Sequence, residues 1–130
     1  MFWTVDSYLG SVNRARMDGS HAVRLVTGLK YPRGIAVDSQ GARLYWTTAS
    51  FDANRLQSSD IHGRDVYTMV RRTAGPIMQG IAVFGHRIYW TNYGTKQLES
   101  MTKGKEELRV LHTARKGISH VAIVHAAKKF

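Results

Sequence analysis

Every tryptophan in this chain follows an aromatic residue and is followed by threonine, and the three copies are evenly spaced. Trp3, Trp46 and Trp90 are separated by 43 and 44 residues. The stretches RLYWTTA and RIYWTNY, which begin at Arg43 and Arg87, are nearly identical. Self-similarity at a fixed period of this length is typical of stacked structural repeats. The tryptophan spacing therefore predicts a repeat protein.

Other features recur with the same phase. GIAVD at 34–38 returns as GIAVF at 80–84 and as HVAIV at 120–124. A turn-like pair ending in glycine follows each tryptophan, at Gly19, Gly63 and Gly104. We therefore divide the chain into one partial repeat domain, 1–130, with repeats 1–43, 44–87 and 88–130.

One period reads as four short strands. The stretch at 33–38 is short and rich in β-branched residues, and 42–48 follows it after a turn that contains glycine. The stretch at 53–61 alternates imperfectly and ends at a His-Gly pair, after which 65–72 gives the fourth strand. Four antiparallel strands in 40 to 45 residues make one blade of a β-propeller. The predicted fold class is all-β, a partial propeller of about three blades. In it, Trp3, Trp46 and Trp90 are structural and fill the space between blades.

The combined pattern resembles the YWTD repeats, also called LDL-receptor class B repeats. YPRGIAVDSQGARLYWTTA and VNRARMDGSHAVRLV match the order of that unit, and IAVFGHRIYWTNYGTKQLESMTKGKEELRVL is similar to the last blade in such receptors. The resemblance covers essentially the whole chain. It implies the C-terminal half of a propeller in a lipoprotein-receptor-like ectodomain.

The resemblance also implies a function. Such propellers are non-enzymatic modules that bind protein ligands or pack against neighbouring receptor modules, and they lie outside the cell or at its surface. The positions that match the family's ligand face are Tyr8, Tyr31, Arg33, Phe51, Met78 and Tyr93. The alternative for these aromatic residues is that they cover blade edges and bind nothing, as in a structural propeller remnant without a ligand.

The chain departs from the family pattern at several positions. The acid that follows Trp-Thr is replaced by Val5, Thr48 and Asn92. The turn proline survives only as Pro32, and the Asp-Gly pair only at Asp18. Because those acids tie neighbouring blades together in the family, their loss predicts a degenerate and less stable propeller.

Three blades do not close a ring, since propellers have four to eight. The strand at 120–124 of one copy could complete the first blade of a second copy, which would give a homodimer with six blades. Alternatively, the sequence is a fragment of a longer receptor. We favour the fragment as the biological explanation and expect a dimer if that fragment is soluble.

The sequence offers no catalytic or metal-binding motif. Asp18 and Asp38 lie at turns, where aspartate bonds local amides, and only Asp38 would face a propeller axis. The histidines are scattered at 21, 62, 86, 112, 120 and 125, without zinc spacing. We expect no enzyme activity, no cofactor and no metal. A histidine between blades remains a candidate pH switch.

The formal net charge of +10 favours an acidic partner. Basic pairs at Arg71 and Arg72 and at Arg115 and Lys116 are candidates for binding a sulfated glycan such as heparan sulfate, which is the alternative function. Nucleic acid is not expected, because no recognition helix or aromatic platform is present. The chain contains no transmembrane segment, and the first ten residues do not read as a signal peptide.

Overall fold

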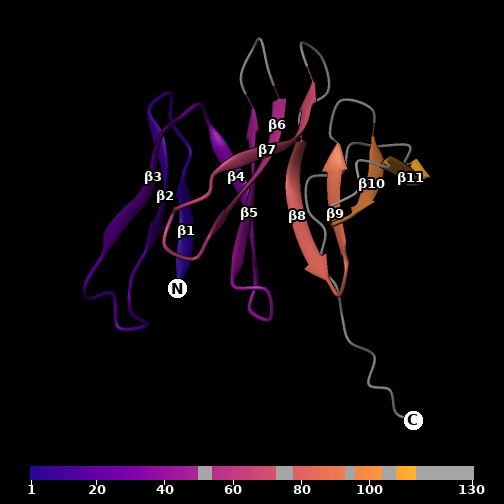
Figure 1. Cartoon of the computed structure of the whole chain (residues 1–130). Helices are drawn as coiled ribbons and strands as arrows, with labels where there is room; N and C mark the ends of the chain where they lie inside the picture. The colour runs from indigo at the N-terminus through magenta and orange to yellow at the C-terminus, as the bar shows by residue number, and fades with distance from the viewer. Residues whose placement is uncertain (50–53, 73–77, 93–95, 104–107, 114–130) are drawn as a thin grey trace.

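The described part of the chain, in a computed structural model, contains eleven β-strands in three antiparallel sheets (Figure 1). The structure describes residues 1–49, 54–72, 78–92, 96–103 and 108–113. Blade 1 contains β1 (Phe2–Val5), β2 (Gly10–Arg14) and β3 (Val23–Leu29). Blade 2 contains β4 (Pro32–Asp38), β5 (Arg43–Ala49), β6 (Asn54–Asp60) and β7 (Tyr67–Arg72). Blade 3 contains β8 (Met78–Phe84), β9 (Arg87–Asn92), β10 (Gln97–Thr102) and β11 (Leu108–Thr113).

The predicted fold class is confirmed. Each sheet is a meander in which successive strands pair, and no helix occurs among the described residues. The four strands expected between residues 33 and 72 correspond to β4, β5, β6 and β7, with ends that differ by at most two residues. The strand expected at 120–124 lies outside the described residues.

The tryptophans occupy one structural position in the three blades. Trp3, Trp46 and Trp90 lie on β1, β5 and β9, and each pairs with a polar residue on the next strand. That partner is Asn13 in blade 1, Gln57 in blade 2 and Glu99 in blade 3. The indole N–H donates to Gln57 over 3.2 Å and to Glu99 over 2.8 Å. In blade 1 it donates to Asn13 over 3.3 Å once the amide of that residue is turned.

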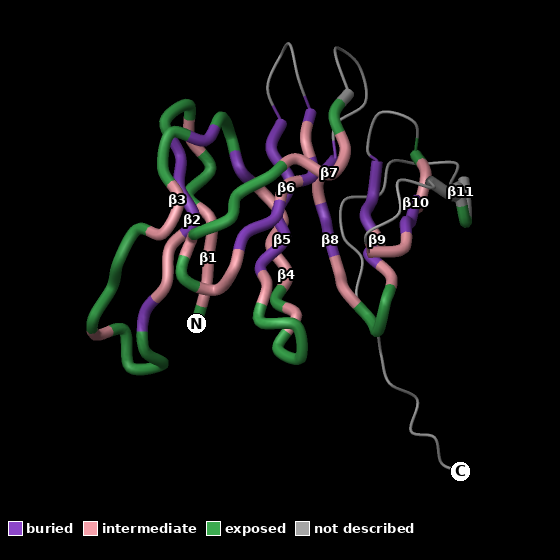
Figure 2. The backbone as a smooth tube through the Cα atoms, in the orientation of Figure 1, coloured by how far each residue is buried: buried purple, intermediate pink, exposed green. Residues whose placement is uncertain are grey.

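The core lies between blades. Trp46 packs in a cluster with Val12 and Leu29 of blade 1, and Trp90 packs in a cluster with Tyr45 and Leu56 of blade 2. Each of these indoles therefore fills the gap between its own blade and the preceding one, as an aromatic side chain with a large buried area can. In Figure 2 most buried segments lie on strands, whereas the turn between β4 and β5 and the turn between β8 and β9 are exposed.

The expectation that all three tryptophans are core residues is wrong for Trp3. It is half-buried, whereas Trp46 and Trp90 have no exposed surface. The difference follows from its place in blade 1, because no described blade precedes that sheet and covers the indole.

The threonines that follow Trp3 and Trp46 join neighbouring blades. Thr47 Oγ1 accepts from the Gly34 amide of its own blade over 3.1 Å and donates to the Gln79 carbonyl of blade 3 over 2.9 Å. Thr4 Oγ1 donates to the Arg33 carbonyl of blade 2 over 2.7 Å. These bonds serve the inter-blade role that the resemblance assigns to an acid one residue later.

Candidate ligand-binding surface

The junction of blades 1 and 2 carries a group of exposed apolar and basic side chains, which we call the tyrosine patch: Tyr8, Leu9, Lys30 and Tyr31. The Tyr8 and Tyr31 rings meet edge to face with centroids 6.2 Å apart. Lys30 Nζ lies 5.6 Å from the Tyr8 ring centroid, within the range of a cation–π contact. Tyr8 is 58% exposed and Leu9 is 77% exposed.

Backbone hydrogen bonds from both blades hold the patch in place. The Tyr31 amide donates to the Ser7 carbonyl over 2.8 Å, and the Ala49 amide donates to the Tyr31 carbonyl over 3.1 Å. Tyr31 has a φ of 50°, a left-handed conformation that is unusual for a bulky residue. Strained backbone of this kind occurs where the surroundings fix it, often at ligand-binding loops.

Arg33 lies close to this junction. Its Nε is 3.5 Å from the Asp6 carboxylate, an ion pair between the two blades, and both side chains remain partly exposed. The structure therefore brings together Tyr8, Tyr31 and Arg33 of the residues predicted to bind a ligand. Leu9 and Lys30 were missed, although each is the sequence neighbour of a tyrosine that was predicted.

The other predicted ligand residues do not join this surface. Met78 is fully buried in the core cluster between blades 2 and 3, which corrects its assignment to a ligand face. The register explains its burial, because Met78 begins β8 opposite the buried Asn92. Phe51 and Tyr93 lie outside the described residues.

The predicted basic residues are only partly described. Arg71 is exposed on β7, and Arg72 ends the same strand. Arg115 and Lys116 lie outside the described residues. The structure adds Arg55 of β6, which is directly opposite Arg71 and whose buried Nε has no hydrogen-bond partner among the described residues. Like charges placed opposite each other across strands destabilise a sheet unless an anion neutralises them.

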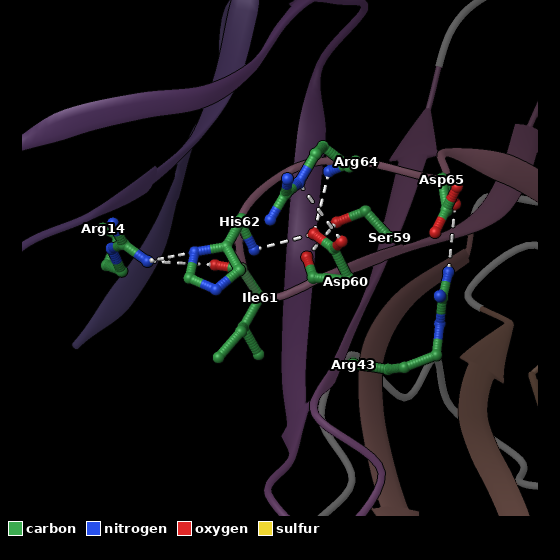
Figure 3. Close-up of polar contacts among 8 residues, drawn as sticks. All are labelled: Arg14, Arg43, Ser59, Asp60, Ile61, His62, Arg64 and Asp65. Carbon is green, nitrogen blue, oxygen red and sulfur yellow. Dashed lines mark hydrogen bonds and ion pairs between the residues drawn. The ribbon is translucent and has the colours of Figure 1, made fainter.

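At the opposite end of blade 2, a group of polar contacts surrounds the turn between β6 and β7 (Figure 3). The Asp60 carboxylate accepts from the backbone amides of His62 and Arg64 over 2.8 and 2.9 Å. The Arg64 amide, with help from that of His62, holds the pKa of Asp60 below its usual value even though burial acts in the opposite direction. Arg14 of blade 1 donates to the Ile61 carbonyl over 3.3 Å.

Asp18 and Asp38 both lie at turns. Asp18 accepts from the hydroxyl and the amide of Ser20 over 2.6 and 2.9 Å, and these bonds lower its pKa. Asp38 accepts from the Gly41 amide over 3.2 Å and also pairs with Lys103 of blade 3. Burial raises the pKa of Asp38, but the hydrogen bonds from Lys103 and Gly41 outweigh it and leave the pKa below its usual value. The Lys103 contact was not foreseen from the sequence.

A cavity of about 390 Å³ lies between the turns that end β4 and β8, and its lining includes Asp38 and Phe84. Across the described ranges, no three His, Asp or Glu side chains gather in a way that would hold a metal ion. No helix in the described part of the chain is long and apolar enough to cross a bilayer.

Three receptors are similar to this chain over most of its length. The chain is 32% identical to the vitellogenin receptor Yl of Drosophila melanogaster over 135 residues, which cover 99% of this chain and 6% of that protein. It is 29% identical to low-density lipoprotein receptor-related protein 5 of Mus musculus, with 98% and 8% covered. It is 30% identical to the sortilin-related receptor of Oryctolagus cuniculus, with 90% and 5% covered. The chain thus spans less than a tenth of each relative.

Solved structures share the fold. A chain in the crystal structure of the nidogen/laminin complex superposes with a TM-score of 0.81 at 24% identity, covering 95% of this chain and 48% of that one. The PQQ-bound aldose sugar dehydrogenase from Streptomyces coelicolor superposes with a TM-score of 0.70 at 12% identity, covering 87% and 42%. At these identities the likeness shows the fold alone. No protein-family model matches the chain.

Proposed function

This chain is a YWTD-repeat β-propeller segment, homologous to the ectodomains of lipoprotein-receptor-like proteins. From that premise we propose that it is an extracellular module and that it binds a protein ligand through the tyrosine patch. The homology supports a receptor-like binding module outside the cell. The finer assignment, to Tyr8, Leu9, Lys30 and Tyr31, is our own.

The observation that carries the proposal is the exposed Tyr8–Tyr31 pair. Tyrosine is enriched among the residues that dominate the energy of protein interfaces. Its ring supplies a large contact area at low cost in conformational entropy. Here the two rings contact each other and the backbone of both blades holds Tyr31, so little further ordering is needed on binding.

The charged neighbours suggest how a ligand would be oriented. The Lys30 ammonium lies over the Tyr8 ring, and the Arg33 guanidinium, two residues after Tyr31, is partly exposed and paired with Asp6. A ligand that places an apolar side chain on the rings and a carboxylate beside them would satisfy both features. Rim charges of this kind contribute chiefly to association rate and specificity.

The test uses as probes the proteins that appear in the names of the similar receptors and of the similar crystal structure. The chain is immobilised, and binding of purified vitellogenin, low-density lipoprotein and laminin is measured. Tyr8→Ala or Tyr31→Ala should weaken binding of the recognised probe by about 30-fold or more, as for an interface hot spot. Tyr67→Ala is the matched control, because Tyr67 is an exposed tyrosine outside the patch.

Two results would reject the proposal. One is that none of the three probes binds. The other is that Tyr67→Ala weakens binding as much as the patch substitutions do, since that would show a general effect on folding or on non-specific adhesion.

Sulfated-glycan binding is a second candidate function, and the facing pair Arg55 and Arg71 favours it. When basic side chains neutralise the anionic groups of a polyanion, the logarithm of the binding constant falls linearly with the logarithm of the salt concentration. The slope of that line is about one per neutralised group. Replacing both arginines by glutamine should reduce that slope on heparin by about two. Arg16→Gln, an exposed arginine on blade 1, is the control and should have a smaller effect.

A further inference from the structure

We propose that the protein ligand of the tyrosine patch carries acidic side chains, and that Arg33, Arg55 and Arg71, which we call the arginine row, bind them. This inference rests on the proposed function and names the chemistry of the ligand. Three observations support it: the register of blade 2, two buried guanidinium nitrogens without an acceptor, and the distribution of charge between the two ends of the blades.

The strand register of blade 2 places the arginine row beside the tyrosine patch. Pro32, which follows Tyr31 and precedes Arg33, pairs with Thr48. Thr48 pairs with Arg55, and Arg55 pairs with Arg71. These positions form one line across the blade, from the inner strand β4 to the outer strand β7. Because neighbouring strands are about 4.8 Å apart, the line is about 14 Å long.

The two outer arginines lie on the face of blade 2 that meets blade 1. Side chains alternate along a strand, so Arg55 shares a face with Gln57. Gln57 accepts from the indole of Trp46, which packs in the core cluster between blades 1 and 2. Arg71 is directly opposite Arg55 and therefore shares its face. Both arginines thus belong to the junction that carries the tyrosine patch.

Two members of the arginine row have a buried N–H without an acceptor. The Nε atoms of Arg33 and Arg55 are buried, and neither donates a hydrogen bond among the described residues. Arg33 Nε is 3.5 Å from the Asp6 carboxylate across the junction, which is longer than a usual N–H···O bond. A buried donor without a partner is costly, so an anion that supplied an acceptor would recover free energy. The row therefore favours an anionic ligand.

The distribution of charge favours the same sign of ligand. At the end of blades 1 and 2 that carries the patch, Asp6 is the one carboxylate among the described residues, whereas Lys30 lies there with the three arginines. The other described aspartates lie at the turns of the opposite end: Asp18, Asp38, Asp60 and Asp65. Two of them pair with basic side chains of that end, through Arg64 and Lys103. The positive excess at the patch end would attract a ligand of opposite charge.

The geometry of the row suits a series of carboxylates. A guanidinium group presents a planar fork that can bind a carboxylate through two hydrogen bonds. An extended peptide rises about 3.3 Å per residue, so acidic side chains at alternate positions share a face and are about 7 Å apart. A row about 14 Å long can therefore accept two or three of them. We expect a ligand segment with acidic residues at alternate positions.

The apolar members of the patch favour a peptide over a sulfated glycan as the occupant. Leu9 is 77% exposed, and the Tyr8 and Tyr31 rings meet edge to face. Burial of the Leu9 side chain stabilises a complex only if the ligand brings an apolar group to it. A peptide can supply both an apolar side chain and carboxylates, so one segment can occupy the patch and the row together.

The experiment measures the binding of two fluorescein-labelled heptapeptides to the full 130-residue chain by fluorescence anisotropy. One probe is leucine followed by alternating glutamate and threonine, and the other has glutamine in place of each glutamate. The glutamate probe should bind at least about tenfold more tightly at low salt, and added salt should reduce the difference by screening. Equal binding of the two probes, or no binding of the glutamate probe, would overturn the proposal.

A double variant tests whether the arginine row is responsible. Arg55→Gln combined with Arg71→Gln, which we call the row variant, should weaken binding of the glutamate probe about tenfold and leave the glutamine probe unchanged. The matched control combines Arg16→Gln with Arg24→Gln, which removes the same charge from exposed positions of blade 1. Equal losses in the two double variants would show attraction by net charge alone and would overturn the assignment.

A single substitution guards against loss of the fold. Arg71 is exposed, so Arg71→Gln should remain folded in urea denaturation. It should weaken binding of the glutamate probe about threefold. A folded Arg71→Gln chain with unchanged affinity for that probe would count against the row.

Two comparisons separate this inference from the proposals above. A protein probe that binds through Tyr8 and Tyr31 but binds the row variant equally well would leave the proposed function standing and overturn this inference. Heparin that binds through the row, with no preference for the glutamate peptide, would assign the row to a glycan and overturn it as well. Competition between the glutamate peptide and the protein probe, lost in the row variant, is the result we expect.

Discussion

Replacing Thr47 by valine isolates the bond between blades 2 and 3. Valine has the shape of threonine, so packing is preserved while the hydroxyl is lost. That hydroxyl accepts from the Gly34 amide and donates to the Gln79 carbonyl, and Thr47 has no exposed surface. The variant leaves the Gly34 amide and the Gln79 carbonyl, both partly buried, without this partner, and each loss costs about 1–2 kcal/mol, the lower part of the range for an unsatisfied polar group.

We therefore expect Thr47→Val to lower the free energy of unfolding by about 2–4 kcal/mol, a large fraction of the 5–15 kcal/mol typical of a domain. Urea denaturation followed by tryptophan fluorescence measures the loss. Thr27→Val, an exposed position on β3, is the matched control and should change stability by less than about 0.5 kcal/mol. A loss for Thr47→Val no larger than the control's would refute the idea that this hydroxyl joins the blades.

Substitutions at three further positions test other contacts. Gly34→Ala should cost about 3 kcal/mol or more, because the new Cβ would overlap the Gln79 carbonyl oxygen of blade 3; a folded variant of unchanged stability in urea would contradict this close approach. Lys103→Met should cost about 2 kcal/mol at pH 7. Since the pKa of Asp38 is lowered on folding, that contribution is present above the ordinary carboxyl pKa of 3.8 and is lost as the pH falls through the folded value, so unfolding curves of both proteins should converge in acid and a constant gap would count against the pair. Glu99→Gln should change stability by less than about 1 kcal/mol, because blade 2 has Gln57 in that position, whereas Glu99→Leu should cost about 1–3 kcal/mol; thermal melts that rank the two variants the other way would show that the buried indole needs no acceptor.

The repeat in the sequence determined the architecture of this protein. The position of each strand follows from short apolar stretches and turn residues, which are local signals, and the strands of a blade are neighbours in the chain. Trp46 and Trp90 could be assigned to the core from their spacing because the same position recurs in successive blades. Turn roles for Asp18 and Asp38 were accessible for the same reason, since their amide donors lie two and three residues away.

Only the tertiary structure decided what happens between blades. The pairing of Asp38 with Lys103 joins residues 65 positions apart, and no periodic pattern marks it. The burial of Met78 and the contact of Lys30 with Tyr8 likewise depend on how neighbouring sheets pack and how loops fold over them. Register within a blade is fixed by short hairpins, whereas contacts across blades depend on side-chain shape summed over a whole interface. For that reason the sequence could identify the repeat, and the structure was needed to locate the surface on which Tyr8 and Tyr31 meet.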